Sequence, residues 1–323
     1  MLVTEPGGHL IEMIGLRRSW GRFPYCWVTL ESPDTHSLLA GERVEYATGP
    51  TSRDWSKLAV NLGNAWRDIR RVRPSVVLTT GGPLSIPYCV VAWMRRIPIV
   101  YVECGGRADR PSVALRVIGP IASRVYVQWP ELLSGSPRVR FVGRVRFSKA
   151  DGLPFGPPHG EPVPHAEVIA TVGTCAFQFD RLVKALDELG TDRDVMIQTG
   201  VSSVCPRFAQ GVAFMPFGML STHMERARVV VTHAGIGSIL LAHAHGKRPI
   251  VVPRRPDLGE QVDDHQIAFA RAMAGEGLIT LVEDPVELQD AIESHSAEPP
   301  LSPTDTDYPL ADELLQYLET LLA

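Results

Sequence analysis

The feature that most constrains this 323-residue chain is a repeated alternation of two kinds of segment. Short runs rich in Val, Ile and Tyr alternate with longer segments whose apolar residues recur at the spacing of a helix face. Runs that are apolar throughout, such as Ile99–Val102, are typical of strands buried on both faces of a parallel sheet. The alternation therefore predicts an α/β protein and argues against a sandwich or a helical bundle.

The alternation is interrupted once. Residues 148–166 hold five prolines and three glycines and show no usable period, which predicts a linker. We therefore expect two tandem Rossmann-like parallel-sheet domains, at 1–147 and 167–323, with a last helix at 309–322 that could pack back across the domain interface. Such sheets bind ligands at the carboxyl ends of their strands, so a cleft between the domains is expected.

The expected elements follow from the pattern. In the first half we expect strands near 1–4, 25–30, 42–47, 75–80, 97–102 and 124–128, and helices near 9–19, 54–71, 84–94 and 112–119. In the second half we expect strands near 167–172, 194–198, 211–215, 228–232, 249–252 and 277–281, and helices near 178–189, 219–226, 236–245 and 263–274.

The two halves differ in charge. Residues 1–150 carry 21 Lys and Arg against 11 Asp and Glu, a net charge of +10, whereas residues 151–323 carry 11 against 25, a net charge of −14. A basic half suits nucleic acid, an anionic membrane or a phosphorylated substrate. The Arg-rich runs at Arg17–Arg18 and Arg67–Arg73 are most often solvated helix faces, and no nucleic-acid module surrounds them, so we expect no nucleic-acid partner.

Five scattered cysteines without a C-x-x-C pair indicate neither a disulfide framework nor a structural zinc site, and they suit a reducing compartment. His243 and His245 are two residues apart on a predicted helix and do not share a face, so we expect no metal and no cofactor. No apolar run reaches the roughly 18 residues that span a bilayer. We expect a cytoplasmic protein, soluble or peripheral.

The sharpest local motif is the block Val229–Leu241, in which an apolar strand runs through Gly235 and Gly237 into a helix. The first amides of a helix are free donors, and glycine lets the backbone approach a phosphate, so the turn predicts a diphosphate cradle. Ser238 adds a hydroxyl donor. The alternative is a tight turn with no ligand.

A second motif follows the next strand. Arg254 and Arg255 could meet an anionic group, and the segment 263–266 begins a helix with carboxylates and an amide that could bind sugar hydroxyls. Asp263 or Asp264 could equally be a helix N-cap.

At the start of the chain, Gly7 and Gly8 repeat the theme of a strand, a glycine turn and a helix, with His9 at the helix entrance. A His in a cleft facing a phosphate-binding half is a candidate general base. The alternative is a capping or packing role. Glu103, which ends a predicted strand, is the reserve candidate.

These motifs carry a family resemblance. Through Val172–Thr174, Phe179–Leu182, Thr232–Ser238, Gly246–Pro249 and Asp264–Gln266, the second half resembles the catalytic subunit of the two-part UDP-N-acetylglucosamine transferase of dolichol-linked glycan assembly. It also resembles bacterial capsule and exopolysaccharide relatives with a glycosyltransferase family 28 C-terminal domain. Through Gly7–Leu10, Pro74–Pro83, Val102–Glu103 and Val127–Pro130, the first half resembles the partner subunit.

The resemblance implies a GT-B fold and an inverting, metal-independent transfer from a UDP-sugar to a polyprenyl-diphosphate-linked sugar. The block Val252–Arg255 with Gly259–Glu260 is more like the exopolysaccharide branch, some of whose members transfer glucuronic acid, so the donor is of the glucuronic acid or N-acetylglucosamine type. Related donor sites often hold the ribose with a Glu where this chain has Leu241.

Site roles follow from the resemblance and the motifs together. We expect Gly173 and Thr174 to line the diphosphate, Phe217 and Gly218 to present backbone groups to uracil, and Gln266 to contact the donor sugar. The full expected donor set is Gly173, Thr174, Phe217, Gly218, His233, Gly235, Ile236, Gly237, Ser238, Arg254, Arg255, Asp264, His265 and Gln266, and the expected acceptor side is Gly7, Gly8, Gly81 and Gly82.

Two clusters of aromatic and cationic residues predict docking to the inner face of the plasma membrane through anionic lipid. They are Arg17, Arg18 and Trp20 in one segment and Trp93, Arg95 and Arg96 in another. Three other functions stay open: a transferase for a soluble small molecule, a UDP-sugar epimerase, and a non-catalytic nucleotide-binding scaffold.

Overall fold

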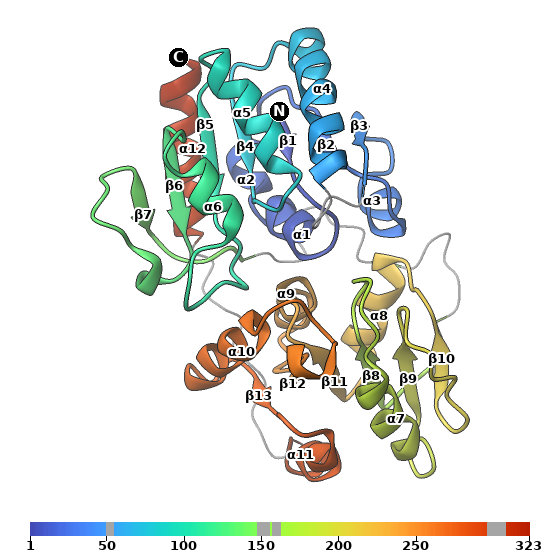
Figure 1. Cartoon of the computed structure of the whole chain (residues 1–323). Coiled ribbons are helices and arrows are strands. Elements are labelled where there is room, and N and C mark those ends of the chain that lie inside the picture. Colours follow the sequence, from blue (N-terminus) through green and yellow to red (C-terminus); the bar gives the residue numbers. More distant parts are fainter. Residues whose placement is uncertain (50–54, 147–155, 157–162, 296–307) are drawn as a thin grey trace. The chain divides into compact units, whose positions relative to one another are not determined.

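The computed structural model describes residues 1–49, 55–146, 156, 163–295 and 308–323. The chain forms two compact units, each of which is described by itself. The first consists of Met1–Phe147 together with Asp307–Ala323, and the second of Ser148–Thr306 (Figure 1). Most of the predicted linker, 148–166, lies outside the described residues.

The first unit is built on a sheet of seven parallel strands in the order β3-β2-β1-β4-β5-β6-β7. The strands are β1 (Leu2–Val3), β2 (Trp27–Leu30), β3 (Val44–Ala47), β4 (Val77–Thr79), β5 (Ile99–Val102), β6 (Arg124–Val127) and β7 (Val139–Phe141). The helices are α1 (Gly8–Gly15), α2 (Arg17–Trp20), α3 (Pro33–Leu38), α4 (Trp55–Val72), α5 (Ser85–Met94), α6 (Val113–Ile118) and α12 (Pro309–Leu322), with a 3-10 turn at Pro130–Leu132.

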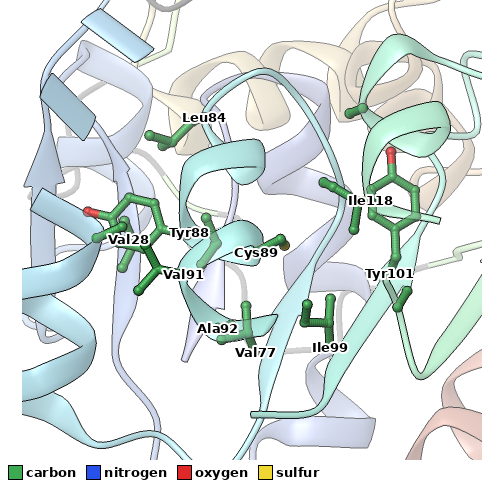
Figure 2. Close-up of a cluster of buried hydrophobic side chains, with 14 of the residues drawn as sticks. Val28, Val77, Leu84, Tyr88, Cys89, Val91, Ala92, Ile99, Tyr101 and Ile118 are labelled. Carbon is green, nitrogen blue, oxygen red and sulfur yellow. The ribbon is translucent and has the colours of Figure 1, made fainter. Parts of the chain in front are cut away.

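One face of this sheet is covered by α4, α5 and α6. Figure 2 shows the core beneath them, in which Tyr88, Cys89 and Ala92 of α5 pack with Val77 of β4 and Ile99 of β5. All five are at most 1% exposed. Because these strands are buried on both faces, they read in the sequence as apolar runs without alternation.

The last helix belongs to the first unit. This corrects its assignment to the second domain and agrees with the alternative that it packs back across the domain interface. Its apolar stripe, Leu310, Ala311, Leu314 and Leu318, is buried. The helix packs against α2, and Glu313 pairs with Arg124 at 3.6 Å. The position of α12 in the sequence gave no sign of this, since it follows the second domain directly.

The second unit contains six parallel strands in the order β10-β9-β8-β11-β12-β13. The strands are β8 (Val168–Thr171), β9 (Val195–Gln198), β10 (Gln210–Val212), β11 (Val229–His233), β12 (Ile250–Val252) and β13 (Thr280–Leu281). The helices are α7 (Asp180–Leu189), α8 (Phe217–Arg226), α9 (Ile236–Ala244), α10 (His265–Gly275) and α11 (Leu288–His295), with 3-10 turns at Pro256–Leu258 and Pro285–Glu287.

The predicted elements are present in both units, and three further ones were not predicted. They are α3, β7 and α11, of six, three and eight residues. β7 is an edge strand of low burial, so its sequence lacks the apolar run of the central strands. Among the described helices, none has both the length and the hydrophobicity needed to cross a bilayer.

Candidate active site

Each sheet has one point at which the strand order reverses direction. In the first unit it lies between β1 and β4, and in the second between β8 and β11. Ligands of open α/β sheets bind beyond the carboxyl ends of the strands at such a point. The loops that leave these four strands carry Gly7–His9, Gly81–Gly82, Gly173–Thr174 and Gly235–Ser238, so the structure places the main predicted glycine motifs at the two expected positions.

In the second unit, the His233 ring fills the space between the two glycine loops. A Cβ atom at Gly173 would lie 2.4 Å from Cε1 of His233, and one at Gly235 would lie 2.1 Å from Nε2. Gly173 also has a φ of 78°, which favours glycine. The ring of His233 thus requires glycine at both positions, and the backbone also requires it at Gly173.

Burial and the nearby Arg254 lower the pKa of His233 to about 3, although part of the side chain remains solvent-accessible. The imidazole is therefore neutral at neutral pH. It shapes the loop as a packing residue and adds no positive charge for a diphosphate.

The start of α9 offers backbone donors. Gly235 is the N-cap, no side chain caps the helix, and the Gly235 amide is bonded to the carbonyl of His233 at 2.7 Å. The next amides, of Ile236, Gly237 and Ser238, are first-turn amides, which have no partner within a helix. With the helix dipole they make a position that favours a negative charge.

Two other residues that we expected to bind the donor nucleotide, Phe217 and Gly218, are the first residues of a helix in the same unit. Phe217 and Gly218 begin α8, after the segment in which the Met215 amide donates to Oε1 of Gln198 at 2.9 Å. Gln198 ends β9, the neighbour of β8, and its amide also donates to Oγ1 of Thr171 at 2.9 Å. These bonds fix the start of α8 relative to the loop that carries Gly173 and Thr174.

Arg254 occupies an unexpected place. It is fully buried, and its guanidinium donates to the carbonyls of Val172 at 2.7 Å, Phe177 at 2.9 Å, Gln178 at 3.1 Å and Glu260 at 3.2 Å. The guanidinium also lies over the Phe179 ring. Both terminal nitrogens of the guanidinium are therefore bonded to backbone carbonyls, while its buried Nε has no partner among the described residues. A direct contact of the terminal nitrogens with an anionic group, as we expected, would require those bonds to break.

Arg255 is exposed and forms a bidentate pair with Asp257, at 3.1 and 2.6 Å. Behind it, Glu260 accepts two hydrogen bonds from Arg181, both at 3.0 Å, and one from the Arg255 amide at 2.9 Å. Glu260 is 6% exposed, so this ion pair fixes the 253–260 segment onto α7.

The start of α10 is held by local contacts. Asp264 is the N-cap residue but its side chain does not cap the helix, while His265 contacts Asp263 through Nδ1. Gln266 is 5% exposed and accepts a hydrogen bond from the Arg254 amide at 3.2 Å. The structure thus places Gln266 beside the loop that follows β12.

In the first unit, His9 bridges the two loops at the strand reversal. Its Nδ1 lies 2.8 Å from the carbonyl of Thr80, and the Thr80 hydroxyl donates to the His9 carbonyl at 2.9 Å. A carbonyl only accepts, so Nδ1 carries the proton and Nε2 keeps the free electron pair in the neutral ring. This is the tautomer that a base acting through Nε2 needs.

The acceptor-side glycines are shaped by their neighbours. Gly7, Gly81 and Gly82 all have positive φ. A Cβ atom at Gly81 would lie 2.6 Å from the Tyr101 hydroxyl, and one at Gly82 would lie 2.9 Å from Cδ of Glu5. Gly8 is the first residue of α1.

The reserve base Glu103 is buried and fully hydrogen-bonded. It accepts from the Ser112 amide at 3.0 Å and the Ser112 hydroxyl at 2.8 Å, and from the Cys104 amide at 2.9 Å. Ser112 caps α6, so Glu103 fixes that helix start. These bonds favour His9 over Glu103 as the residue open to a substrate.

Sequence reasoning missed Glu12, one helical turn after His9. It is fully buried; its Oε1 accepts from the Gly105 amide at 2.8 Å and from Nε2 of Gln128 at 2.6 Å. Burial raises its pKa, while His9 and these hydrogen bonds act in the opposite direction. The available signal was an acidic residue on the inner face of an otherwise apolar helix.

The structure corrects one of the two membrane-facing clusters. Trp20 is 2% exposed, donates to the Met13 carbonyl at 2.9 Å and packs edge-on against Trp27. Arg17 pairs with Glu42, and Arg18 lies over the Tyr308 ring. Trp20 cannot insert into a membrane, because it belongs to the core beside α12.

The second cluster is exposed. Trp93 and Met94 are 56% and 59% exposed, and Arg95 and Arg96 are exposed beside them. The Arg95 guanidinium lies 5.5 Å from the ring centre of Trp66, a half-exposed residue of α4.

Comparison with known proteins divides the chain as the fold does. Residues 168–307 match the glycosyltransferase family 28 C-terminal domain, and residues 55–145 match the family described as oligosaccharide biosynthesis protein Alg14 like.

Two curated relatives illustrate the two halves. A UDP-N-acetylglucosamine–N-acetylmuramyl-(pentapeptide) pyrophosphoryl-undecaprenol N-acetylglucosamine transferase from Treponema denticola is 24% identical over 254 residues, which cover 70% of this chain and 64% of that protein. The UDP-N-acetylglucosamine transferase subunit ALG14 of Rattus norvegicus is 27% identical over 176 residues, which cover 45% of this chain and 82% of the relative. The matched region spans less than two thirds of the bacterial transferases, only 21% in the protein of Moorella thermoacetica.

Solved structures show the GT-B fold. MurG of Acinetobacter baumannii superposes with a TM-score of 0.60 at 13% identity, covering 99% of both chains. A UDP-GlcNAc 2-epimerase from Neisseria meningitidis superposes with a TM-score of 0.64 at 12% identity, covering 99% of this chain and 98% of the epimerase. At such low identity, these likenesses show the fold alone.

Proposed function

Because this chain is a GT-B protein with a glycosyltransferase family 28 C-terminal domain and an Alg14-like domain, we propose that it transfers a sugar from a UDP-sugar to a polyprenyl-diphosphate-linked sugar. The observation that carries the proposal is the open start of α9, framed by Gly173 and Gly235, at the strand reversal of the family 28 domain. Relatives named as UDP-N-acetylglucosamine transferases support an N-acetylglucosamine donor, and a glucuronic acid donor is the variant that the 252–260 segment suggested.

The second unit holds the donor in this proposal. The amides of Ile236, Gly237 and Ser238 receive the diphosphate, and the backbone of Phe217 and Gly218 receives the uracil. As the bond between the anomeric carbon and the diphosphate breaks, UDP gains negative charge. Helix amides already aimed at that charge stabilise it without reorganisation, by several kcal/mol in a closed site. The transfer therefore needs no metal.

The first unit supplies the base. Nε2 of His9 takes the proton of the acceptor hydroxyl while the hydroxyl oxygen bonds to the anomeric carbon on the face opposite UDP, which inverts that centre. The Thr80 carbonyl holds Nδ1–H and so fixes the ring and its tautomer. The product sugar stays on the lipid, and His9 releases its proton to water.

A direct assay tests the proposal. Purified protein is incubated with UDP-N-acetylglucosamine, UDP-glucuronic acid and other UDP-sugars, with and without a polyprenyl-diphosphate-linked sugar, and products are identified by mass. We expect transfer that persists in EDTA, and a His9→Ala enzyme with kcat lowered on the order of 10²–10⁴-fold and nearly unchanged UDP affinity. A His9→Ala enzyme that keeps most of its kcat, with an inactive Glu103→Gln enzyme, would move the base to Glu103.

The epimerase likeness gives a second candidate, since that structure superposes as well as the transferase does. An epimerase would convert a UDP-sugar into its isomer without any acceptor. The sequence matches favour a transferase, because both curated relatives above carry that name. Isomerised UDP-sugar in the acceptor-free reaction would decide for the epimerase.

A lipid-linked acceptor requires access to a membrane, and we place that contact on α4 and α5. The apolar-basic patch consists of Leu62, Trp66, Trp93 and Met94, all more than 40% exposed, with the neighbouring arginines Arg67, Arg70, Arg95 and Arg96. Apolar side chains can enter the interface while arginines meet lipid phosphate. The net charge of +10 on the first half favours the anionic cytoplasmic leaflet.

A further inference from the structure

Three side chains of different chemistry, one of them the predicted base His9, lie close together in the first unit. A ring nitrogen of His9, a carboxylate oxygen of Glu12 and the thiol of Cys104 lie within 4.8 Å of one another. His9 and Glu12 are one turn apart on α1, and Cys104 follows β5, two strands away from β1 in the sheet. The three residues therefore converge through the fold and not through sequence spacing.

Two of the three potential ligands are already oriented by a second contact. His9 donates from Nδ1 to the Thr80 carbonyl, which leaves Nε2 open. Glu12 receives two hydrogen bonds on Oε1, from Gly105 and Gln128. Metal ligands in proteins are typically held in this way by a carbonyl or amide in the surrounding layer.

One atom in this cluster lacks a partner. Oε2 of Glu12 is buried, in a residue that is 0% exposed, and accepts no hydrogen bond from the described part of the chain. The Cys104 thiol also interacts with the Glu12 carboxyl. A buried oxygen without a donor destabilises the fold, so the position favours a cation or a hydrogen-bond donor.

We propose that His9, Glu12 and Cys104 form a binding site for a Zn²⁺ ion. A nitrogen, an oxygen and a sulfur ligand together suit Zn²⁺ and not Mg²⁺ or Ca²⁺, which prefer oxygen alone. Zinc bond lengths of about 2.0–2.3 Å place tetrahedral ligands roughly 3.5 Å apart, so small side-chain rotations suffice. One carboxylate and one thiolate balance the charge of the ion, and the fourth position is left for water.

The consequence for activity rests on the proposed function. Zinc on Nε2 of His9 occupies the electron pair that would accept the acceptor proton. The ion is therefore an inhibitor and not a cofactor: transfer continues in EDTA and falls when zinc is added. Free zinc that binds this three-residue site would therefore inhibit transfer by blocking His9.

Metal binding is tested without any substrate, with Co²⁺ as the probe of the zinc site. The full-length reduced protein, freed of metal, is titrated with Co²⁺ and then with competing Zn²⁺, and the thiolate-to-cobalt absorption band in the ultraviolet is recorded. We expect one equivalent of Co²⁺ with a thiolate band that Zn²⁺ abolishes. Cys104→Ser should lose the band, and Glu12→Gln should bind at least 10-fold more weakly. The control Cys205→Ser, which changes an exposed cysteine of the second unit, should titrate like the wild type.

The absence of a thiolate band in the wild type, or an unchanged band in Cys104→Ser, would overturn the site. Equal Tm values of the variants in EDTA show that they are folded. The zinc-induced rise in Tm should be as large in Cys205→Ser as in the wild type and smaller in Cys104→Ser and Glu12→Gln. Inhibition by zinc is tested in a separate activity assay. Loss of transfer at zinc concentrations that saturate the site supports the inhibitory role of zinc, and unimpaired transfer by the zinc-loaded enzyme refutes it. An absence of any transfer would contradict the proposed function and leave the spectral result standing.

Discussion

At the carboxyl end of β11, the His233 ring occupies the space that a side chain at position 235 would need. We predict that Gly235→Ala lowers UDP affinity at least 10-fold, because its Cβ, 2.1 Å from Nε2, forces the ring or the α9 start to move. Overpacking of this kind costs about 1–3 kcal/mol. Calorimetric titration with UDP measures the effect. Gly275→Ala is the matched control in the same unit, since no atom lies within 4 Å of its added Cβ, and its affinity should equal that of the wild type.

Arg254 and Arg255 are adjacent in the sequence and opposite in environment. We predict that Arg254→Met lowers Tm markedly, because four carbonyls around the buried guanidinium lose their donor, at about 1–3 kcal/mol for each that stays unsatisfied. Arg255→Met should leave Tm nearly unchanged, since its ion pair with Asp257 is exposed. Thermal unfolding of both variants, with UDP affinity as the second readout, makes the comparison. A stable Arg254→Met protein that has only lost UDP would restore the anion-binding role.

At the level of single residues, a sequence predicts features that depend on local neighbours and misses those that depend on distant ones. The glycine turn at 235–237 was predictable because an apolar strand, two glycines and a helix follow one another within one short segment. Burial of Arg254 was not visible, since its acceptors are carbonyls at 172, 177, 178 and 260, which only the fold brings together. Glu12 was missed for the same reason: its partners Gly105 and Gln128 are more than 90 residues away.

Among the elements, α12 is the one whose position the sequence could not give. The strands and long helices are predictable from local patterns, because burial on one face leaves a period in the sequence and burial on both faces leaves an unbroken apolar run. No local pattern shows which of the two units a terminal helix packs against. Its stripe Leu310, Leu314 and Leu318 shows only that it packs somewhere.

A stability measurement can confirm that place. We predict that Leu314→Ala destabilises the first unit by about 2–5 kcal/mol, because Leu314 is fully buried where α12 packs against α2. Leu322→Ala, at a residue 38% exposed near the end of the same helix, should cost far less. Urea unfolding followed by tryptophan fluorescence suits the test, since Trp20 and Trp27 lie in that unit. Equal losses for the two variants would argue against the packing of α12 described here.

At the scale of the whole molecule, the fold shows which unit carries the basic residues and which carries the acidic ones. Nearly all of the basic half lies in the unit that carries His9, which also includes the acidic residues of α12, and the rest of the acidic half lies in the unit with the family 28 match. A basic surface alone would serve a nucleic acid, a membrane or a soluble phosphate equally well. The exposed tryptophans of the apolar-basic patch favour the membrane, because an interfacial aromatic residue gains little from a soluble phosphate.

Vesicle binding tests that assignment on the intact protein. We predict that the wild type cosediments with vesicles containing phosphatidylserine, more weakly as salt is raised, because each arginine near an anionic surface contributes on the order of 1 kcal/mol and is screened by salt. Trp93→Ser combined with Met94→Ser should reduce binding several-fold by removing the apolar contact. Phe208→Ser, at a residue 61% exposed in the second unit, is the matched control and should bind like the wild type. Equal sedimentation with neutral vesicles, or equal losses for the patch and control variants, would show that this surface does not dock on anionic lipid.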